Sequence, residues 1–330
     1  VGYVNFDNEN LVNVENYEEI IEALKLLYNN PKTIFFDEIQ NLPRWELFVN
    51  RLQRQGYELI LSGSNANLLS AELSTHLTGR YLSTLIFPFS FKEYLGLSEK
   101  NLTESEIKSC LDKYIVEGGY PEPIVEGIDR KSYLSTLFDS VVYKDIIKRH
   151  NPGYPKELES LANYLISNAG TKVAYKNLTD PAGIGSEHTV KKYIGYLEEA
   201  FLIFQVRRFS FKIKEQERAN KKIYVIDNGL ITARAFSFSE NAGRLYENAV
   251  AIELKKRELG GELEFYYYGN KYEVDFVVKK GTTVESLIQV SFDFKGRETK
   301  EREIRGLLHA SEELNCDNLM VITGEYSGEE

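Results

Sequence analysis

The stretch of residues 33–40, Thr-Ile-Phe-Phe-Asp-Glu-Ile-Gln, combines a short apolar run with two adjacent acids. An apolar run of this length that ends in polar residues is typical of a strand buried within a parallel sheet. Open sheets of this kind bind their ligands at the carboxyl ends of the strands. The stretch therefore predicts an α/β fold in which Asp37 and Glu38 face a ligand crevice.

An acid pair at this place suits the hydrolysis of a nucleotide. The first acid, Asp37, can hold Mg²⁺ through water. The second, Glu38, can orient and polarise the water that attacks a γ-phosphate. A strand that ends in two solvated acids is the alternative interpretation, so the flanking sequence has to decide between the two.

Segments with regular apolar spacing flank this strand on both sides. A helix between consecutive strands is the connection that a parallel sheet requires. Polar residues follow the last run, and such side chains can touch a γ-phosphate or the attacking water, which makes Ser64 and Asn65 candidates. The expected elements are strands at residues 1–6 and 59–61 and helices at residues 17–27 and 45–53.

Composition limits the classes of protein to which the chain can belong. With 330 residues, 42% of them hydrophobic, it can bury substantial cores in two or three domains. No apolar run approaches the roughly 20 residues of a membrane span and no signal peptide opens the chain, so we expect a cytoplasmic protein without a membrane partner. The 2 cysteines and 4 histidines show no metal-ligand spacing. The net charge of −10 means that any binding of nucleic acid must be local.

Four blocks of sequence resemble the AAA-type ATPases that carry an uncharacterised C-terminal half. By that resemblance they are the Walker B strand, the sensor 1 strand, a Gly-Arg motif and a Pro-Phe-Ser-Phe-Lys-Glu signature. The resemblance implies ATP and Mg²⁺ as ligands, and it implies that Arg80 is the arginine that meets the developing phosphate charge. The alternative is that Arg80 is a surface arginine without a role in hydrolysis. The blocks are residues 34–45, 59–70, 76–81 and 87–95.

The phosphate-binding loop of such ATPases is missing from these residues. That loop has the pattern Gly-x-x-x-x-Gly-Lys-Ser/Thr, and the chain contains no Gly-Lys dipeptide. The chain opens at Val1 with what resembles the strand that follows the loop and its helix. We therefore expect the loop to lie upstream of Val1, and we expect the 330 residues alone to bind and hydrolyse ATP poorly.

Residues 99–152 are expected to form a helical lid. Residues 102–116 and 132–147 show helical apolar spacing, and residues 117–123 between them contain two glycines and two prolines, which predicts a rigid turn. The triplet Gly-Tyr-Pro that ends at Pro121 resembles the Gly-x-Pro with which signal-transducing ATPases place a proline against the adenine. A plain turn is the alternative.

Residues 153–235 predict a winged helix-turn-helix. Three short helical segments, the last beginning after a capping Ser186, precede paired strands at residues 204–211 and 222–226. We expect this fold to contact duplex DNA through exposed residues of the third helix and of the basic wing at residues 205–222, although such a surface also suits a protein partner. The helix supplies His188, Thr189, Lys191 and Lys192, and the wing supplies Arg207, Arg208, Lys212, Lys214, Arg218, Lys221 and Lys222.

Residues 236–330 contain acids in segments with apolar periodicity. Glu247 lies on the apolar stripe of an expected helix at residues 244–259 and needs a partner or a metal. Asp275 lies in an expected strand at residues 272–278, opposite its two neighbours, and Gln289 and Ser291 share one face of another at residues 287–292. This layout resembles that of the PD-(D/E)xK nucleases, in which acids and a lysine bind magnesium and activate water. Because Gln and Ser replace an acid and the lysine, we expect weak or lost catalysis.

The missing lysine of that site could come from elsewhere, and Lys279, Lys280 and Lys295 are the candidates. The expected architecture is α/β, with a partial P-loop ATPase sheet, a helical lid, a winged helix and a restriction-endonuclease-like domain. The function expected first is a nucleotide-dependent switch that acts on DNA or on a protein. A non-catalytic DNA-binding or adaptor protein and a magnesium-dependent nuclease are the alternatives. The expected domains are residues 1–98, 99–152, 153–235 and 236–330.

Overall fold

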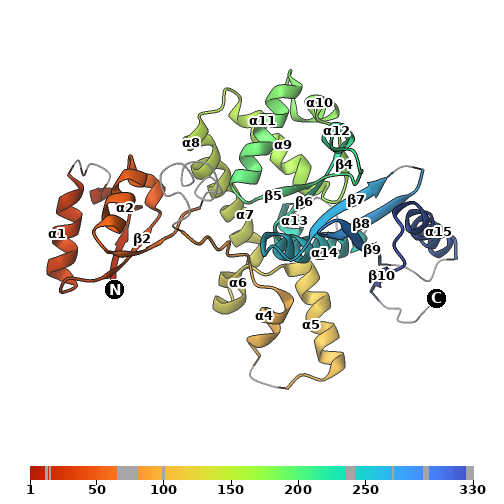
Figure 1. The fold of residues 1–330 in the computed structure, drawn as a ribbon, viewed down its shortest axis with the longest axis horizontal. Coiled ribbons are helices and arrows are strands. Elements are labelled where there is room, and N and C mark those ends of the chain that lie inside the picture. The colour runs from red at the N-terminus through yellow and green to blue at the C-terminus, as the bar shows by residue number, and fades with distance from the viewer. Residues whose placement is uncertain are drawn as a thin grey trace. The chain divides into compact units, whose positions relative to one another are not determined.

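The chain is a mixed α/β protein, as the sequence predicted. Its computed structural model describes residues 1–11, 14, 16–64, 81–98, 101–234, 242–269, 271–292 and 297–324, and of Arg297 and Glu298 it describes the backbone alone. Two compact units divide the chain, Val1–Thr84 and Leu85–Glu330 (Figure 1). Among the helices in the described ranges, none is both long and apolar enough to cross a membrane.

The first unit is built on a three-stranded parallel sheet. Its order is β1-β2-β3, and both neighbouring pairs are parallel, which confirms the prediction of a parallel strand with an acidic end. That strand, β2, is the central one. The elements are β1 (Gly2–Asn5), a 3-10 turn (Glu9–Leu11), α1 (Tyr17–Leu27), β2 (Thr33–Asp37), a second 3-10 turn (Ile39–Asn41), α2 (Trp45–Arg54) and β3 (Glu58–Leu61).

Apolar side chains of both helices hold β2 in place. The ring of Phe36 on β2 lies 5.6 Å from the ring of Phe6 and 5.6 Å from that of Phe48 on α2. The side chain of Asn16 accepts a hydrogen bond from the backbone N–H of Glu18 and caps α1. The buried side chains around β2 include Ile20, Ile21, Leu24, Ile34, Trp45, Val49 and Leu52.

The second unit begins with a group of helices. The turn expected at residues 117–123 is only partly present, because Pro121 opens a helix at its first position, where the missing proline N–H leaves no hydrogen bond unmade. The single helix expected at residues 132–147 changes to a π-helix in its second half. The elements are α4 (Phe91–Gly96), α5 (Glu104–Glu117), α6 (Pro121–Glu126), α7 (Arg130–Ser140), the π-helix (Val141–Ile147) and α8 (Lys148–His150).

A small antiparallel sheet with the order β4-β6-β5 follows. Two expectations were wrong in detail: Ser186 makes no capping hydrogen bond with its side chain, and the wing contains a helix, so the strand expected to reach residue 211 ends at Val206. The elements are α9 (Pro155–Ser167), β4 (Lys172–Val173), a 3-10 turn (Tyr175–Leu178), α10 (Thr179–Ala182), α11 (Glu187–Glu199), β5 (Ile203–Val206), α12 (Ile213–Arg218) and β6 (Lys221–Val225).

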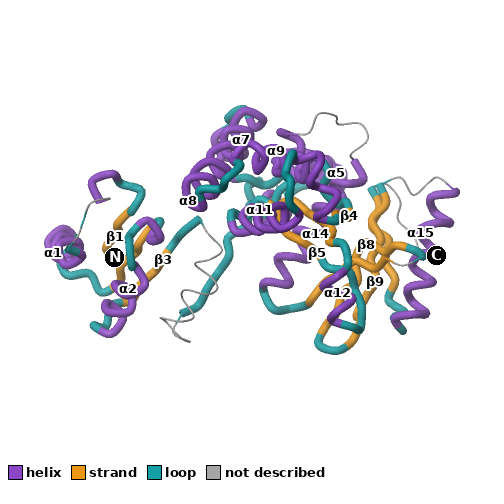
Figure 2. Tube along the Cα trace, turned by 90° about the horizontal axis from the view of Figure 1, so that it is seen from above, coloured by secondary structure: helices purple, strands orange, loops and turns teal. Residues whose placement is uncertain are grey.

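A four-stranded sheet with the order β10-β9-β8-β7 forms the C-terminal part. Side chains on one face pack with α14 and those on the other face with α15, which lies alongside the strands in Figure 2. Only the β10–β9 pair is parallel. The elements are α13 (Asn228–Arg234), α14 (Ala242–Leu259), β7 (Glu264–Gly269), β8 (Glu273–Lys280), β9 (Thr283–Ser291), α15 (Arg297–Leu314) and β10 (Leu319–Thr323).

An irregularity in β8 redirects the strand at Asp275. Tyr266 pairs with Val277 and Tyr268 pairs with Val274, so two steps along β7 correspond to three along β8. A bulge of this kind re-aims side chains. Val274 and Phe276, expected on one face, consequently pack into different clusters, Val274 with α15 and Phe276 with α14.

Two buried asparagines connect β6 to the surrounding helices. The side chain of Asn248 on α14 accepts the N–H of Val225 (2.8 Å) and donates to the carbonyl of the same residue (2.9 Å). Asn248 also donates to the side-chain oxygen of Asn228, whose own amide donates to the carbonyls of Ile115 and Leu245. Because each buried polar atom has a partner, the network specifies how α5, α14 and β6 meet.

A buried acid, Asp227, should make the stability of the second unit depend on pH. Burial raises the pKa of Asp227 to about 6, although the N–H groups of Gly119 and Gly229 donate to it and oppose the shift. In the unfolded chain the pKa is about 3.9. The folded state therefore binds a proton more tightly. The resulting stabilisation is complete below about pH 3.9 and is lost as the pH rises through about 6, with a slope of about 1.4 kcal/mol per pH unit.

We therefore expect protonation of Asp227 to raise the free energy of unfolding, measured by urea denaturation, at about pH 5, and we expect this increase to be absent at about pH 7. Asp227→Asn is the control, because it removes the titration. This variant should be less stable at both pH values, since its amide nitrogen would face a backbone N–H donor. The same pH slope in both proteins would contradict the assignment.

Candidate nucleotide site and buried acid cluster

Asp37 lies at the carboxyl end of β2, where side chains from both neighbouring strands reach it. The hydroxyl of Tyr3 on β1 donates a hydrogen bond of 2.9 Å to Oδ2 of Asp37, and the hydroxyl of Ser62, which follows β3, donates to Oδ1. The bond to Asp37 raises the pKa of the Tyr3 hydroxyl. Residues on or directly after the three strands thus bring one carboxylate and two hydroxyl groups together at the carboxyl end of the sheet.

Glu38 follows in a left-handed backbone conformation, with φ 51° and ψ 44°. This conformation is uncommon for a residue other than glycine, and it occurs most often where surrounding contacts enforce it. Here the N–H of Glu38 points to the hydroxyl of Ser62 (3.4 Å), and the side-chain amide of Gln40 donates to the Glu38 carboxylate. The conformation turns the chain out of the strand and fixes the second acid beside the first.

The residues predicted at the end of β3 are only partly described. Ser64 is half-buried close to this edge, whereas Asn65 and Arg80 lie outside the described residues. Ser62, which directly follows β3 and was not among the predicted residues, contacts Asp37. The parallel register pairs Phe36 with Leu61, so the next residue of each strand, Asp37 and Ser62, also lie side by side. That register was the signal from which Ser62 could have been predicted.

Carboxylate and hydroxyl oxygens are ligands that Mg²⁺ accepts, so the side chains of Asp37 and Ser62 fit a magnesium ion held directly or through water. In the second unit Pro121, the predicted adenine contact, lines a cavity of about 310 Å³. Its walls are apolar and partly aromatic, which suits a flat ring. They include Phe87, Pro88, Tyr120 and Tyr133.

The C-terminal acids meet around a lysine that the sequence reasoning assigned to the DNA-binding wing. Nζ of Lys222 on β6 lies 2.9 Å from Oε1 of Glu247 and 2.9 Å from Oδ1 of Asp275. It also lies 3.1 Å from Oε1 of Glu273, and the side chain of Lys222 is 3% exposed. The expectation that Glu247 needs a partner is confirmed, and the partner is this lysine. Lys222 is therefore no part of a solvent-facing wing.

Gln289 does not face that lysine. Its side-chain oxygen accepts the backbone N–H of Asp275 (3.1 Å), and the N–H of Val290 donates to Oδ2 of Asp275 (3.0 Å). Ser291 is buried at the end of β9. Of the lysines proposed to complete the cluster, Lys279 instead pairs with Glu264 (3.0 Å), Lys280 is exposed at the end of β8, and Lys295 lies outside the described residues.

The predicted DNA-binding residues differ in their surroundings. Lys191 and Lys192 on α11 are exposed, and so is Lys214 on α12. Others pair within the segment itself: Arg207 lies 3.3 Å from Glu217, and Lys212 lies 3.1 Å from Glu215. The guanidinium of Arg208 donates to the carbonyl of Gly269 (3.5 Å). The exposed cationic surface therefore includes fewer residues than the number of basic residues in the sequence suggested.

Family comparisons define the class of the first unit. A model described as an AAA domain matches residues 1–95, so nucleotide binding of the ATPase type is the activity that the sheet and its acids indicate. Two models, each described as a domain of unknown function, match residues 108–240 (DUF8612) and 242–329 (DUF4143). No solved structure matches the chain.

Whole-chain comparisons then give the particular family. The chain is 35% identical to the uncharacterized protein MJ1544 of Methanocaldococcus jannaschii, over 99% of this chain and 76% of that protein. It is 30% identical to an uncharacterized protein of Haemophilus influenzae, over 99% of this chain and 80% of that one. The chain belongs to the family of these AAA-domain proteins, and the resemblance to AAA-like ATPases is confirmed at that level.

Proposed function

We propose that this protein is a nucleotide-dependent switch that binds and hydrolyses ATP. The observation that carries the proposal is the meeting of Asp37, Glu38 and Ser62 at the carboxyl end of the central strand. Asp37 would hold Mg²⁺, which neutralises charge on the transferred phosphate. Glu38 would accept a hydrogen bond from the attacking water and align it, while Ser62 keeps the Asp37 carboxylate in position. Ser64, Asn65 and Arg80 are the further candidates for contacts with the γ-phosphate.

The acids require a phosphate cradle as their counterpart. These 330 residues contain no Gly-Lys dipeptide, so the usual loop of backbone amides and lysine is not among them. Separately, within the second unit alone, we propose that a flat ring such as adenine can stack on the proline and tyrosines of the cavity beside Pro121. Binding there would make α6 and α7 sensitive to the occupant of that cavity.

The test uses the protein at its natural length. Titration calorimetry should detect ATP binding that strengthens when Mg²⁺ is present, and a phosphate-release assay should detect turnover. Absence of both signals would leave the first unit as a scaffold and would favour a non-catalytic adaptor.

We propose as a second function that residues 153–235 bind duplex DNA as a winged helix. Two observations favour it: the β4-β6-β5 order with α11 beside it, and the exposed cations Lys191 and Lys192 on that helix. In such a domain the last helix before the paired strands lies in the major groove. Phosphate contacts by lysines would supply most of the affinity in an otherwise acidic protein.

Replacing Lys191 and Lys192 together by glutamine should weaken DNA binding equally for all sequences. Because each lost phosphate contact removes about one released counterion, the slope of log affinity against log salt should fall by about 2. Fluorescence anisotropy with a labelled duplex over a range of salt concentrations measures this slope. Lys108→Gln on α5, also exposed, is the matched control. A flat salt dependence in the unaltered protein would instead indicate a protein partner.

A further inference from the structure

The acid cluster around Lys222 does not fit the metal ion that a nuclease-like site implies. In such a site two carboxylates converge on a divalent cation with open positions for substrate and water. Here Glu247 and Asp275 converge on the ammonium group of Lys222. A divalent cation placed between the same oxygens would meet that positive charge at contact distance.

We propose that the Lys222 ammonium is the permanent cation of this cluster, which makes the cluster an internal latch between β6 and the C-terminal sheet and not a magnesium site.

Three acids surround the ammonium group of Lys222. Two of its three N–H donors bond to Glu247 and Asp275, each at 2.9 Å. The carboxylate of Glu273 forms a further ion pair at 3.1 Å. The donors that would stabilise a hydroxide or a phosphate are thus engaged mainly by carboxylates of the protein, which does not suit the role that the nuclease lysine performs.

The surroundings of Lys222 favour its charged form. Burial alone would lower the pKa of the Lys222 amine, but Tyr224 and the three carboxylates raise it well above its usual value. The ion pairs with the three carboxylates favour the ammonium form for the same reason.

The acids have further hydrogen-bond partners. Oδ2 of Asp275 accepts the N–H of Val290, and the hydroxyl of Tyr224 donates a hydrogen bond of 2.6 Å to Oε1 of Glu247, the oxygen that also contacts Lys222. Gln289 accepts the N–H of Asp275 and therefore needs no charge. The glutamine that departs from the nuclease pattern is thus compatible with a site in which the cation comes from β6.

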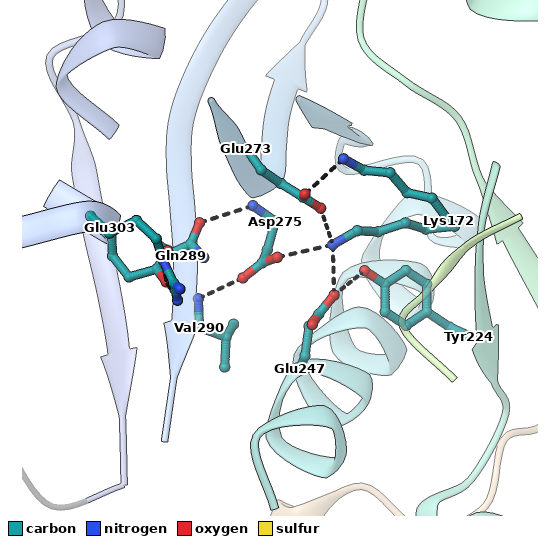
Figure 3. Close-up of polar contacts among 10 residues, drawn as sticks. Lys172, Tyr224, Glu247, Glu273, Asp275, Gln289, Val290 and Glu303 are labelled. Atoms are coloured by element: carbon teal, nitrogen blue, oxygen red, sulfur yellow. Dashed lines mark hydrogen bonds and ion pairs between the residues drawn. The ribbon is translucent and has the colours of Figure 1, made fainter. Parts of the chain in front are cut away.

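A second ion pair extends the latch. Lys172 on β4 lies 2.7 Å from Oε2 of Glu273 (Figure 3). Two lysines from the β4-β6-β5 sheet therefore face three acids from α14 and β8. Backbone bonds continue the contact, because the N–H of Phe209 donates to the carbonyl of Tyr267 on β7 (2.7 Å). The expected consequence is that the two sheets move as one body.

Binding of Mn²⁺, followed by electron paramagnetic resonance, tests the latch. All proteins carry Asp37→Asn, which removes the acid pair of the first unit from the measurement. The protein that retains Lys222 should show no Mn²⁺ binding that is lost when Asp275 is replaced by asparagine. Lys222→Met, in which a thioether of similar length replaces the amine, should gain one Mn²⁺ site per chain. Adding Asp275→Asn to Lys222→Met should remove that site again.

Two results would overturn the proposal. One is a Mn²⁺ site in the Lys222 protein that Asp275→Asn abolishes, since the metal would then be the natural occupant; this measurement remains decisive even where Lys222→Met fails to fold. The other is a folded Lys222→Met protein that gains no Mn²⁺ site. Plasmid DNA incubated with Mg²⁺ should also stay uncut, and cleavage that Asp275→Asn abolishes would restore the nuclease interpretation.

Discussion

Glutamine in place of Glu38 is expected to lower the rate of ATP hydrolysis by a factor of about 10² to 10⁴, the range typical for removal of a catalytic base. The amide keeps the size of the side chain and can still bond with Gln40, so the left-handed turn at residue 38 should survive. What is lost is the negative charge that polarises the attacking water. ATP binding should stay close to that of the unaltered protein, because the magnesium ligand Asp37 is intact.

Phosphate release and calorimetric binding, measured on the same preparations at natural length, separate these two effects. Glu22→Gln is the matched control, because Glu22 is an exposed acid on α1 and its loss changes the net charge equally. Hydrolysis that is unchanged in the Glu38 variant would mean that the acid pair is only a solvated strand end. In that case the proposed enzyme would lose its base, and Asp37 would have to be explained as a purely structural acid.

The sequence predicts those parts of the site that depend on interactions between residues close together in the chain. The strand that ends in Asp37 and the helices beside it follow from apolar spacing within about ten residues, the length scale on which such patterns operate. Ser62 required one more step, the register between two parallel strands. The turn at Glu38 left no trace in the sequence, because a left-handed glutamate is enforced by its surroundings and not by its own preference.

The cluster around Lys222 was predicted wrongly because its residues lie far apart in the sequence. Lys222 is separated by 25 residues from Glu247 and by 53 from Asp275, and no periodic pattern links them. A lysine within a basic stretch is usually solvated, which led to its assignment to the wing. One signal could have corrected this. Lys222 and Tyr224 share one face of a strand in which residues 223 and 225 are apolar, so a strand buried on both faces would bring both side chains into a region that needs an acid.

Alanine in place of Gly118 is expected to destabilise the second unit by about 4 kcal/mol, a magnitude reached when overpacking and backbone strain act together. Gly118 has φ +75°, and a Cβ built there would lie 1.9 Å from Oδ1 of Asp227. Relief of that overlap would move the Asp227 carboxylate, which is held by the N–H groups of Gly119 and Gly229. The buried acid would then lose hydrogen bonds as well as space.

Gly127→Ala supplies the matched control, since Gly127 has a similar φ of +67° and nothing lies within 4 Å of the added Cβ. Its expected loss is about 1 kcal/mol, the penalty for a left-handed alanine alone. Urea denaturation followed by circular dichroism measures both variants. The chain has one tryptophan, Trp45, and it lies in the first unit, so its fluorescence should report an unchanged transition for both. Equal losses of unfolding free energy in the two variants would show that the Asp227 side chain can move aside. The packing of Gly118 and Gly119 against this acid would then not be a rigid part of the fold.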